Sequence, residues 1–413
     1  MSGRVIVVGS VNIDLVARVP HLPHPGETVT GGTYERHHGG KGGNQAVAAA
    51  RLRRPTLFIG AVGDDTFEKE ARRALTTERV DVSMVASLPG QSTGMALILV
   101  DATGENEIAV VPGANGAIET GYVRDCLSRL GPLNGDVMLV CNEVPLHVVR
   151  EALICGHAAG ATTVLNPAPA IGIDRAIFGL ADIVTPNRTE LATLLQTEAR
   201  RTGRRLDSAS TDAAVRARSL LEPGPEGPGV RKAVIVTLGA AGVVVLERVG
   251  SGLDGTVAGR LLGPDPNAGC DDAGAAVAPP AAEVPAMALA AASTPAEPAV
   301  DIFPTPAFSD VPMPEPVAAV AAQPVRIPAP ELAVGSIKVW EVPADEVATV
   351  DSTGAGDAFC GALAAALAEG RPLAEAVRRA VAGSALATTH SGAREGMPTA
   401  KELDEFLTAH AGA

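Results

Sequence analysis

The stretch DSTGAGDAFCGAL, residues 351–363, leads from a cluster of small residues directly into a helical pattern. Small residues ahead of a helix let the backbone approach an anion closely, and the free N–H groups of the first turn favour negative charge there. Asp357 would lie in this turn, where a carboxylate repels an anion unless it has a chemical task. A general base for a substrate hydroxyl, beside an anion hole of Gly354, Ala355 and Gly356, is such a task. A plain N-cap aspartate is the alternative.

Outward from this stretch, short runs of Val, Ile and Leu recur between helical patterns. Runs of this kind are typical of central parallel strands whose two faces are covered by helices. Their alternation predicts an α/β fold, layered around the sheet. The expected strands are residues 5–8, 56–59, 137–140, 163–165, 183–185 and 233–236. The expected helices are residues 44–52, 68–76, 146–159, 191–195, 213–221, 356–368, 373–388 and 400–409.

Two stretches, residues 11–34 and 93–111, break this rhythm with short alternating patterns and Pro or Gly turns. Alternation with a period of two indicates strands that have one exposed face. We therefore expect them to form a small antiparallel sheet apart from the main one.

Residues 250–334 have a different composition, rich in Ala and Pro and poor in basic residues. Such a segment buries too little apolar surface to offset the entropy lost on ordering, and Pro blocks regular strand pairing. We interpret it as a disordered insertion in a surface turn, because such turns accept long insertions readily. A tether for a partner is the alternative. The insertion would interrupt a β-hairpin of residues 243–247 and 336–342.

Charge and cysteine content argue against several classes of protein. The formal net charge is -14 and no Lys/Arg-rich run is present, so we expect no nucleic-acid partner. Five cysteines without a C-x-x-C pair favour reduced thiols in a cytoplasmic protein over a zinc site. We see no signal-peptide pattern and no apolar window of about 18 residues, so we expect no membrane association.

A second glycine cluster, GGKGGN at residues 39–44, also precedes a helical pattern. It lacks the Lys-Ser/Thr pair and the glycine spacing of a Walker phosphate loop. Lys41 and Asn44 suit a polyhydroxylated ligand, and an exposed glycine turn is the alternative. Asn12 and Asp14 follow a strand at positions i and i+2, so their side chains face the same way and suit vicinal hydroxyls. An Asx turn is equally consistent with that pair.

Two further motifs follow expected strands in the second half of the chain. PNRTE, residues 186–190, places Asn187 and Glu190 either as a reciprocal helix cap or as oxygen groups near a hydrated magnesium ion. TLGAAG, residues 237–242, either approaches a nucleotide through Thr237 and Gly239 or forms a simple turn between strands.

In order and spacing, these motifs resemble the ribokinase branch of the ribokinase and phosphofructokinase-B superfamily. The resemblance covers nearly all of the chain outside residues 250–334. VGSVNIDLVARVPHLPHPGET (8–28) is similar to the family's N-terminal sugar-binding stretch, GGKGGNQAVAAARL (39–52) to its first signature and DSTGAGDAFCGAL to its second. The stretches STGMALILVDATGENEIAVVPGAN (92–115), LNPAPA (165–170) and VTPNRTEL (184–191) resemble the ribokinase branch more closely than other members.

The resemblance implies a three-layer α/β/α sandwich with a central mostly parallel sheet and a small β-sheet lid, residues 11–34 and 93–111, that doubles as a homodimer interface. It implies one kinase domain over residues 1–413 that transfers a phosphoryl group from ATP to the 5-hydroxyl of D-ribose, giving ribose 5-phosphate and ADP. A related kinase, such as a deoxyribokinase or fructokinase, and a catalytically silent sugar-binding protein are the alternatives. An intact base and anion hole argue against the silent protein.

The resemblance also assigns roles at matching positions. Asp357 would be the base, and Gly354, Ala355 and Gly356 the anion hole. The implied sugar-binding residues are Asn12, Asp14, Gly40, Lys41, Asn44, Glu143 and Asp357. Asn187 and Glu190 would lie near Mg²⁺ and the phosphates, and Asn187, Thr237 and Gly239 near ATP.

A monovalent cation, usually K⁺, activates members of this family beside the anion hole. The matching positions are Asp351, Thr353 and the backbone carbonyls of Ala387, His390 and Gly392. Two positions depart from the family's pattern. Cys360 replaces the usual Asn of the second signature, and Gly396 stands where a side-chain hydroxyl is common near the cation.

Overall fold

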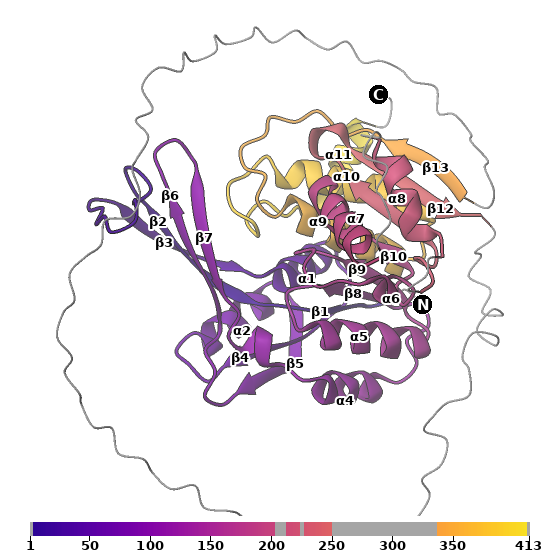
Figure 1. Ribbon diagram of the computed structural model, residues 1–413, viewed down its shortest axis with the longest axis horizontal. Helices are drawn as coiled ribbons and strands as arrows, with labels where there is room; N and C mark the ends of the chain where they lie inside the picture. Colours follow the sequence, from indigo (N-terminus) through magenta and orange to yellow (C-terminus); the bar gives the residue numbers. More distant parts are fainter. Residues whose placement is uncertain (1–2, 203–211, 224–226, 250–336, 411–413) are drawn as a thin grey trace, which may run out of the picture. The chain divides into compact units, whose positions relative to one another are not determined.

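A nine-stranded sheet runs through the computed structural model, which describes residues 3–202, 212–223, 227–249 and 337–410 (Figure 1). All neighbouring strands are parallel except the pairs β11–β12 and β12–β13. The sequence prediction of a mostly parallel sheet is confirmed. In sheet order the strands are β13 (Ile337–Val342), β12 (Val243–Arg248), β11 (Ala233–Thr237), β10 (Ile183–Val184), β9 (Thr162–Asn166), β8 (Val137–Cys141), β1 (Val5–Val8), β4 (Thr56–Gly63) and β5 (Val80–Leu88).

Helices cover both faces of this sheet, because its central strands are apolar on both faces. In β1, Val5 and Val7 enter one hydrophobic core, and Ile6 and Val8 enter the other. This arrangement confirms the three-layer α/β/α architecture. The first face carries α1 (Lys41–Arg51), α2 (Glu68–Thr77), α9 (Ala355–Ala368), α10 (Leu373–Ala387) and α11 (Ala400–Ala409). The second carries α3 (Ala114–Ala117), α4 (Thr120–Leu130), α5 (Leu146–Ala158), α6 (Arg175–Phe178), α7 (Arg188–Thr202) and α8 (Ala213–Leu221).

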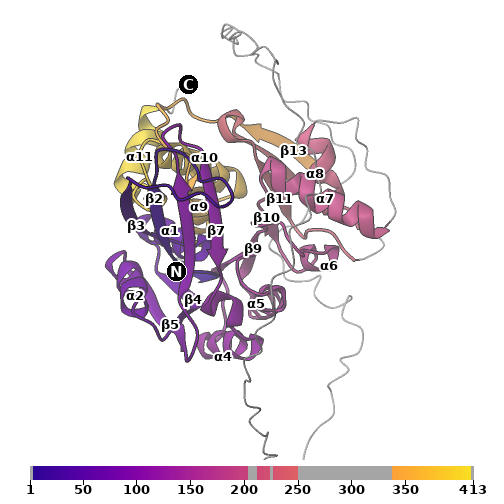
Figure 2. The same cartoon turned by 60° about the vertical axis from the view of Figure 1, so that its left-hand side comes forward.

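A separate four-stranded sheet contains β2 (Asn12–Arg18), β3 (Thr33–Gly39), β6 (Gly94–Val100) and β7 (Asn106–Val111), in the order β3-β2-β6-β7 (Figures 1 and 2). The expectation of a purely antiparallel sheet is wrong, because the central strands β2 and β6 pair in parallel, with Asn12 opposite Gly94. Each belongs to its own antiparallel pair, β2–β3 and β6–β7. The sheet therefore joins two hairpins side by side.

Several element boundaries differ from the sequence prediction. Helix α1 begins at Lys41, in the middle of the glycine cluster, because the Glu143 carboxylate accepts a hydrogen bond from the Lys41 backbone N–H at 2.9 Å. Helix α7 continues to Thr202, well past the predicted end at residue 195. Strand β5 and helix α4 were not predicted. β5 is an edge strand of mixed burial, and α4 contains the helix-disfavouring Gly121.

Strands β12 and β13 pair antiparallel from Val243 opposite Val342 to Arg248 opposite Ile337. This pairing confirms the expected hairpin. Trp340, the only tryptophan of the chain, lies on the edge strand β13 and packs against the core. The expected disordered insertion, residues 250–334, lies outside the described residues. None of the helices in the described ranges is long and apolar enough to span a bilayer.

We expect that replacing residues 251–332 with a short turn leaves kcat and the KM for ATP within about twofold of the full chain. Arg248 and Ile337 face each other across the β12–β13 pair, so a short connection is sufficient to close the hairpin. An ADP-release assay on the deletion variant and the full chain, run side by side, checks this prediction. A large rise in the KM for ATP would show that the segment takes part in nucleotide binding.

Candidate active site

The N-terminus of α9 holds Asp357 in its first turn, next to the main sheet. Gly354 is the N-cap residue, in a left-handed conformation with φ 77°, and no side chain caps the helix. A Cβ on Gly354 would lie 2.9 Å from the Ala393 Cα atom, so only glycine fits there without displacement. Since Gly354 and not Asp357 caps the helix, the plain N-cap interpretation of Asp357 is wrong.

Two side-chain amides from α1 hold the buried Asp357 carboxylate. Asn44 Nδ2 donates to Oδ2 at 3.0 Å, and Gln45 Nε2 donates to Oδ1 at 3.0 Å. Gln45 Nε2 also donates to Asn166 Oδ1 at 3.2 Å. Both oxygens are thereby oriented by neutral donors, which leaves the carboxylate able to accept a proton.

A cavity of about 520 Å³ lies in front of this carboxylate. It brings together predicted residues from four separate motifs, so the motifs converge on one site in space. The Asp357 carboxylate raises the pKa of Lys41, so the ammonium group stays charged beside it. The predicted residues that line the cavity are Lys41, Asn187, Glu190, Thr237, Gly239, Gly354, Ala355, Gly356 and Asp357, and Cys360 joins them.

A second group of predicted residues adjoins this cavity through Lys41. Glu143 Oε2 accepts hydrogen bonds from the Lys41 backbone N–H at 2.9 Å and from Ser10 Oγ at 2.5 Å. Asn12 is buried, and its Oδ1 accepts from Asn115 Nδ2 at 2.8 Å. Gly40 connects β3 to α1 directly before Lys41.

Asp14 is a buried carboxyl with one oxygen, Oδ1, that has no hydrogen-bond partner among the described residues. Burial raises its pKa to about 6. Gly39 allows the close approach, since a Cβ at that position would lie 2.0 Å from Asp14 Oδ2. An unpartnered acceptor of this kind suits a hydroxyl donor on a bound ligand.

Asn187 and Glu190 form the reciprocal cap that the sequence allowed. The Asn187 backbone N–H donates to Glu190 Oε2, and the Glu190 backbone N–H donates to Asn187 Oδ1, each at 2.8 Å. Asn187 Nδ2 also donates to Glu190 Oε1 at 2.8 Å, and burial raises the pKa of Glu190. Both side chains line the cavity, and their oxygens fit a hydrated Mg²⁺ through water rather than by direct ligation.

The residues of the expected cation site also come together. Asp351 accepts hydrogen bonds from the backbone N–H groups of Thr353 at 2.8 Å and Gly392 at 2.9 Å. The carbonyl oxygens of Ala387 and Gly392 converge on Gly396, where a Cβ would lie 2.3 and 3.4 Å from them. This cradle of oxygens fits a monovalent cation. The exposed His390 ring instead pairs with Thr389 Oγ1 at 2.9 Å.

Sequence reasoning missed several residues of the site. Gln45 directly follows Asn44 in the first signature, so its position was a usable signal. Arg394 Nε donates to Asn44 Oδ1 at 2.9 Å, but it belongs to no motif in the sequence. The others, Ser10, Asn115 and Asn166, lie next to quoted stretches or inside them.

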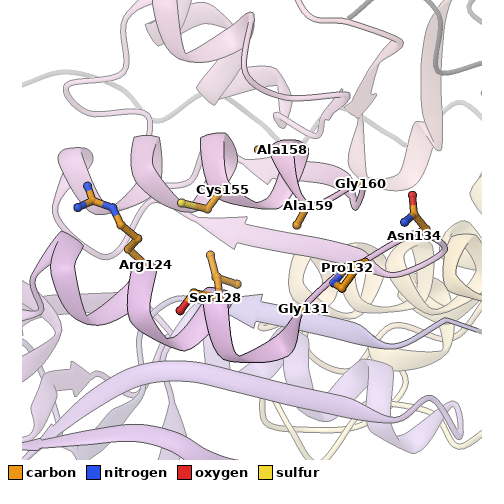
Figure 3. A pocket seen from close by; sticks show the side chains of 10 residues that line it. Arg124, Ser128, Gly131, Pro132, Asn134, Cys155, Ala158, Ala159 and Gly160 are labelled. Carbon is orange, nitrogen blue, oxygen red and sulfur yellow. The ribbon is translucent and has the colours of Figure 1, made fainter. Parts of the chain in front are cut away.

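A second hollow lies between α4 and α5, on the second face of the sheet (Figure 3). Its lining includes no carboxylate, and Arg124 is already paired with Glu151 at 2.6 Å. Burial raises the pKa of the Cys155 thiol to about 11, so the thiol is unreactive near neutral pH. This hollow therefore offers neither a base nor a nucleophile.

Comparison with known proteins agrees with this geometry. The profile of the pfkB family carbohydrate kinases matches residues 2–255 and 332–400, on either side of the Ala/Pro-rich segment. A ribokinase of Schizosaccharomyces pombe is 38% identical over 247 residues, covering 58% of this chain and 73% of that protein. A ribokinase of Haemophilus influenzae is 36% identical over 248 residues, covering 60% and 76%.

The fold comparison gives the same result. The crystal structure of a ribokinase from Thermotoga maritima is similar with a TM-score of 0.67 and 26% identity, over 98% of this chain and 99% of that one. The family profile spans most of the sequence, and the site residues of its motifs converge in space. The chain therefore belongs to the pfkB family of carbohydrate kinases.

Proposed function

We propose that the protein transfers the γ-phosphoryl group of ATP to the 5-hydroxyl of D-ribose, giving ribose 5-phosphate and ADP. The observation that carries this proposal is the buried, amide-held Asp357 at the N-terminus of α9, facing a cavity that Lys41 also lines. A proton acceptor beside an anion-binding helix start is what transfer to an alcohol requires.

In this mechanism Asp357 accepts the proton of the sugar hydroxyl as its oxygen attacks the γ-phosphorus atom. The backbone N–H groups of Gly354, Ala355 and Gly356 stabilise the charge that develops on the transferring group, and the Lys41 ammonium group adds to this. Asn187, Thr237 and Gly239 hold the nucleotide at the far side of the cavity. The sugar is bound by Asn12, Asp14, Gly40, Lys41, Asn44 and Glu143.

Two cations complete the proposal. Mg²⁺, near Asn187 and Glu190, would neutralise the phosphates of ATP. K⁺ would lie at the cradle of Asp351, Thr353 and the carbonyls of Ala387, His390 and Gly392. Since the Asp351 carboxylate already bonds two backbone N–H groups, its own role is to hold this loop in place.

The four-stranded sheet is proposed as a lid and a homodimer interface. Every residue of β7 is exposed, with Ile108 at 57% and Val110 at 58% exposure. Leu97, on the neighbouring strand β6, is also exposed. An apolar strand face of this kind suits a second copy of the chain. A cytoplasmic location is proposed because the four cysteines within the described ranges are free thiols.

A coupled ADP-release assay with MgATP and K⁺ tests the proposed function. The acceptors are ribose, 2-deoxyribose, fructose and adenosine, with a control that lacks any sugar. Preference for ribose with ribose 5-phosphate as product supports the proposal. Faster turnover of another acceptor moves the specificity within the same mechanism, and no turnover with any acceptor overturns the kinase assignment.

The affinity for ribose is expected to fall as the pH drops through about 6, the raised pKa of Asp14. A sugar hydroxyl donates best to the ionised carboxylate, so binding favours that form and lowers its pKa. Affinity is then full above this pH and lost below it as the free protein takes up a proton. Titration calorimetry with ribose between about pH 5 and pH 8 measures the effect.

The matched variant is Asp14→Asn, which should bind ribose more weakly at neutral pH and without this pH dependence. If Asp14→Asn keeps the same fall in affinity, another group titrates and the assignment to Asp14 is wrong. Asp404→Asn, an exposed carboxylate on α11 that pairs with Arg379, serves as the control with unchanged behaviour.

A further inference from the structure

Arg394 is a buried guanidinium group that bonds neutral partners. Its side chain donates from Nε to Asn44 Oδ1 at 2.9 Å and from Nη2 to the Gly39 carbonyl at 2.8 Å. Its Nη1 has no hydrogen-bond partner within the described ranges. Burial lowers the pKa of Arg394 to about 10, which leaves it charged at neutral pH. A buried cation bonded only to neutral acceptors is costly, so its retention calls for a role beyond packing.

The contact with Asn44 decides which way that amide faces. The oxygen and nitrogen atoms of an Asn side chain are similar in shape, so the amide can be placed in two orientations. Arg394 Nε can only donate, so Asn44 Oδ1 must face it. Asn44 Nδ2 must then face the other way, towards Asp357 Oδ2, to which it donates at 3.0 Å. With the amide reversed, an oxygen would oppose the carboxylate.

The second contact ties the same guanidinium group to the end of the lid strand β3. Gly39 is the last residue of β3 and precedes Gly40, the N-cap of α1. Arg51 donates to the Arg394 carbonyl at 2.6 Å and so holds the backbone that carries the guanidinium group. Arg394 therefore bridges the strand that carries the glycine cluster and the amide that orients the base.

We propose that Arg394 is a positioning residue that sets the orientation of Asp357 through Asn44. The inference rests on the proposed function, since it assigns Asp357 the role of base. Arg394 itself makes no hydrogen bond to Asp357. Its removal should therefore disturb the chemical step, which depends on the direction of the carboxylate, more than the binding of ATP.

The main variant is Arg394→Met, which removes every donor and keeps a long side chain in the buried site. We expect kcat to fall by about 10- to 100-fold, because small misplacements of a reacting group cost this much. The KM for ATP should stay within about twofold of wild type. Arg394→Lys keeps the charge and one donor group, and should recover part of the lost kcat. Arg379→Met, which breaks the pair with Asp404, is the control and should leave kcat unchanged.

A double-mutant cycle with Asn44→Ala separates positioning from general destabilisation. If Arg394 acts through Asn44, adding Arg394→Met to Asn44→Ala should lower kcat further by less than about twofold. Independent losses that multiply would overturn the inference, and so would wild-type kcat in Arg394→Met. Should Arg394→Met fail to fold in a thermal unfolding test, the same cycle is measured with Arg394→Lys.

All variants are assayed with the acceptor that the wild-type protein phosphorylates fastest, so a failure of ribose as substrate does not affect the comparison. Wild-type turnover together with full activity of Arg394→Met would reject the positioning role and leave the kinase function standing. Turnover of a different sugar, with a non-additive loss in the cycle, would support the positioning role and correct the substrate.

Discussion

Replacing Asp357 with asparagine is expected to lower kcat by about 10²- to 10⁴-fold, the usual contribution of a general base. Asparagine has the same shape but cannot accept the proton of the sugar hydroxyl. The amides of Asn44 and Gln45 that hold the carboxylate can bond the new Oδ1, so the site keeps its geometry. Ribose affinity should therefore stay close to that of the wild type.

Two measurements check this result: kcat from ADP release and ribose affinity from titration calorimetry. Asp404→Asn makes the same chemical change on the surface of α11 and should have wild-type kcat. Near-normal turnover in Asp357→Asn would remove the assignment of the base. Loss of ribose binding together with activity would instead assign Asp357 to sugar binding alone.

Replacing Gly354 with alanine is expected to lower kcat by about 10²- to 10³-fold, the cost of losing one donor of an anion hole. Gly354 has φ 77°, and its new Cβ would lie 2.9 Å from both the Cα and the carbonyl oxygen of Ala393. These are backbone contacts, so the start of α9 must shift. The N–H groups of the first turn then move away from the transferring phosphoryl group.

The left-handed conformation also costs alanine about 1–2 kcal/mol of folding free energy. Thermal unfolding should therefore show a lower Tm, and kinetics at a temperature well below it isolates the effect on the site. Gly121→Ala in α4, where a Cβ meets nothing within 4 Å, is the matched control. It should leave kcat unchanged and raise helix stability slightly. Wild-type kcat in Gly354→Ala would show that the anion hole lies elsewhere.

The layered fold could be predicted because its central strands are apolar on both faces. β1 and the helices α8 and α11 have the predicted bounds, and β8 and β11 extend by one residue each. The direction of β2 relative to β6 could not be predicted, since alternation of side chains is the same in parallel and antiparallel pairs. Strand β5 lies at the sheet edge, where the apolar signal is weak.

The candidate site could be predicted only in its motifs. The pairing of Asn44 with Asp357 joins positions 313 residues apart, which no local pattern reveals. The resemblance to a family supplied that pairing. Arg394 escaped notice because it stands in a loop without a motif, and its importance lies in burial and bonding, which are properties of the folded chain.

The position of Trp340 has an optical consequence. It is the only indole of the protein, and it lies on β13, directly opposite Val245 of β12. Its Nε1 atom is buried without a protein partner in the described part of the chain. Fluorescence excited at the red edge of the absorption band therefore comes from one seam, where two segments far apart in the sequence are joined. Emission recorded during heating, beside circular dichroism of the whole molecule, would show whether this seam opens before the rest.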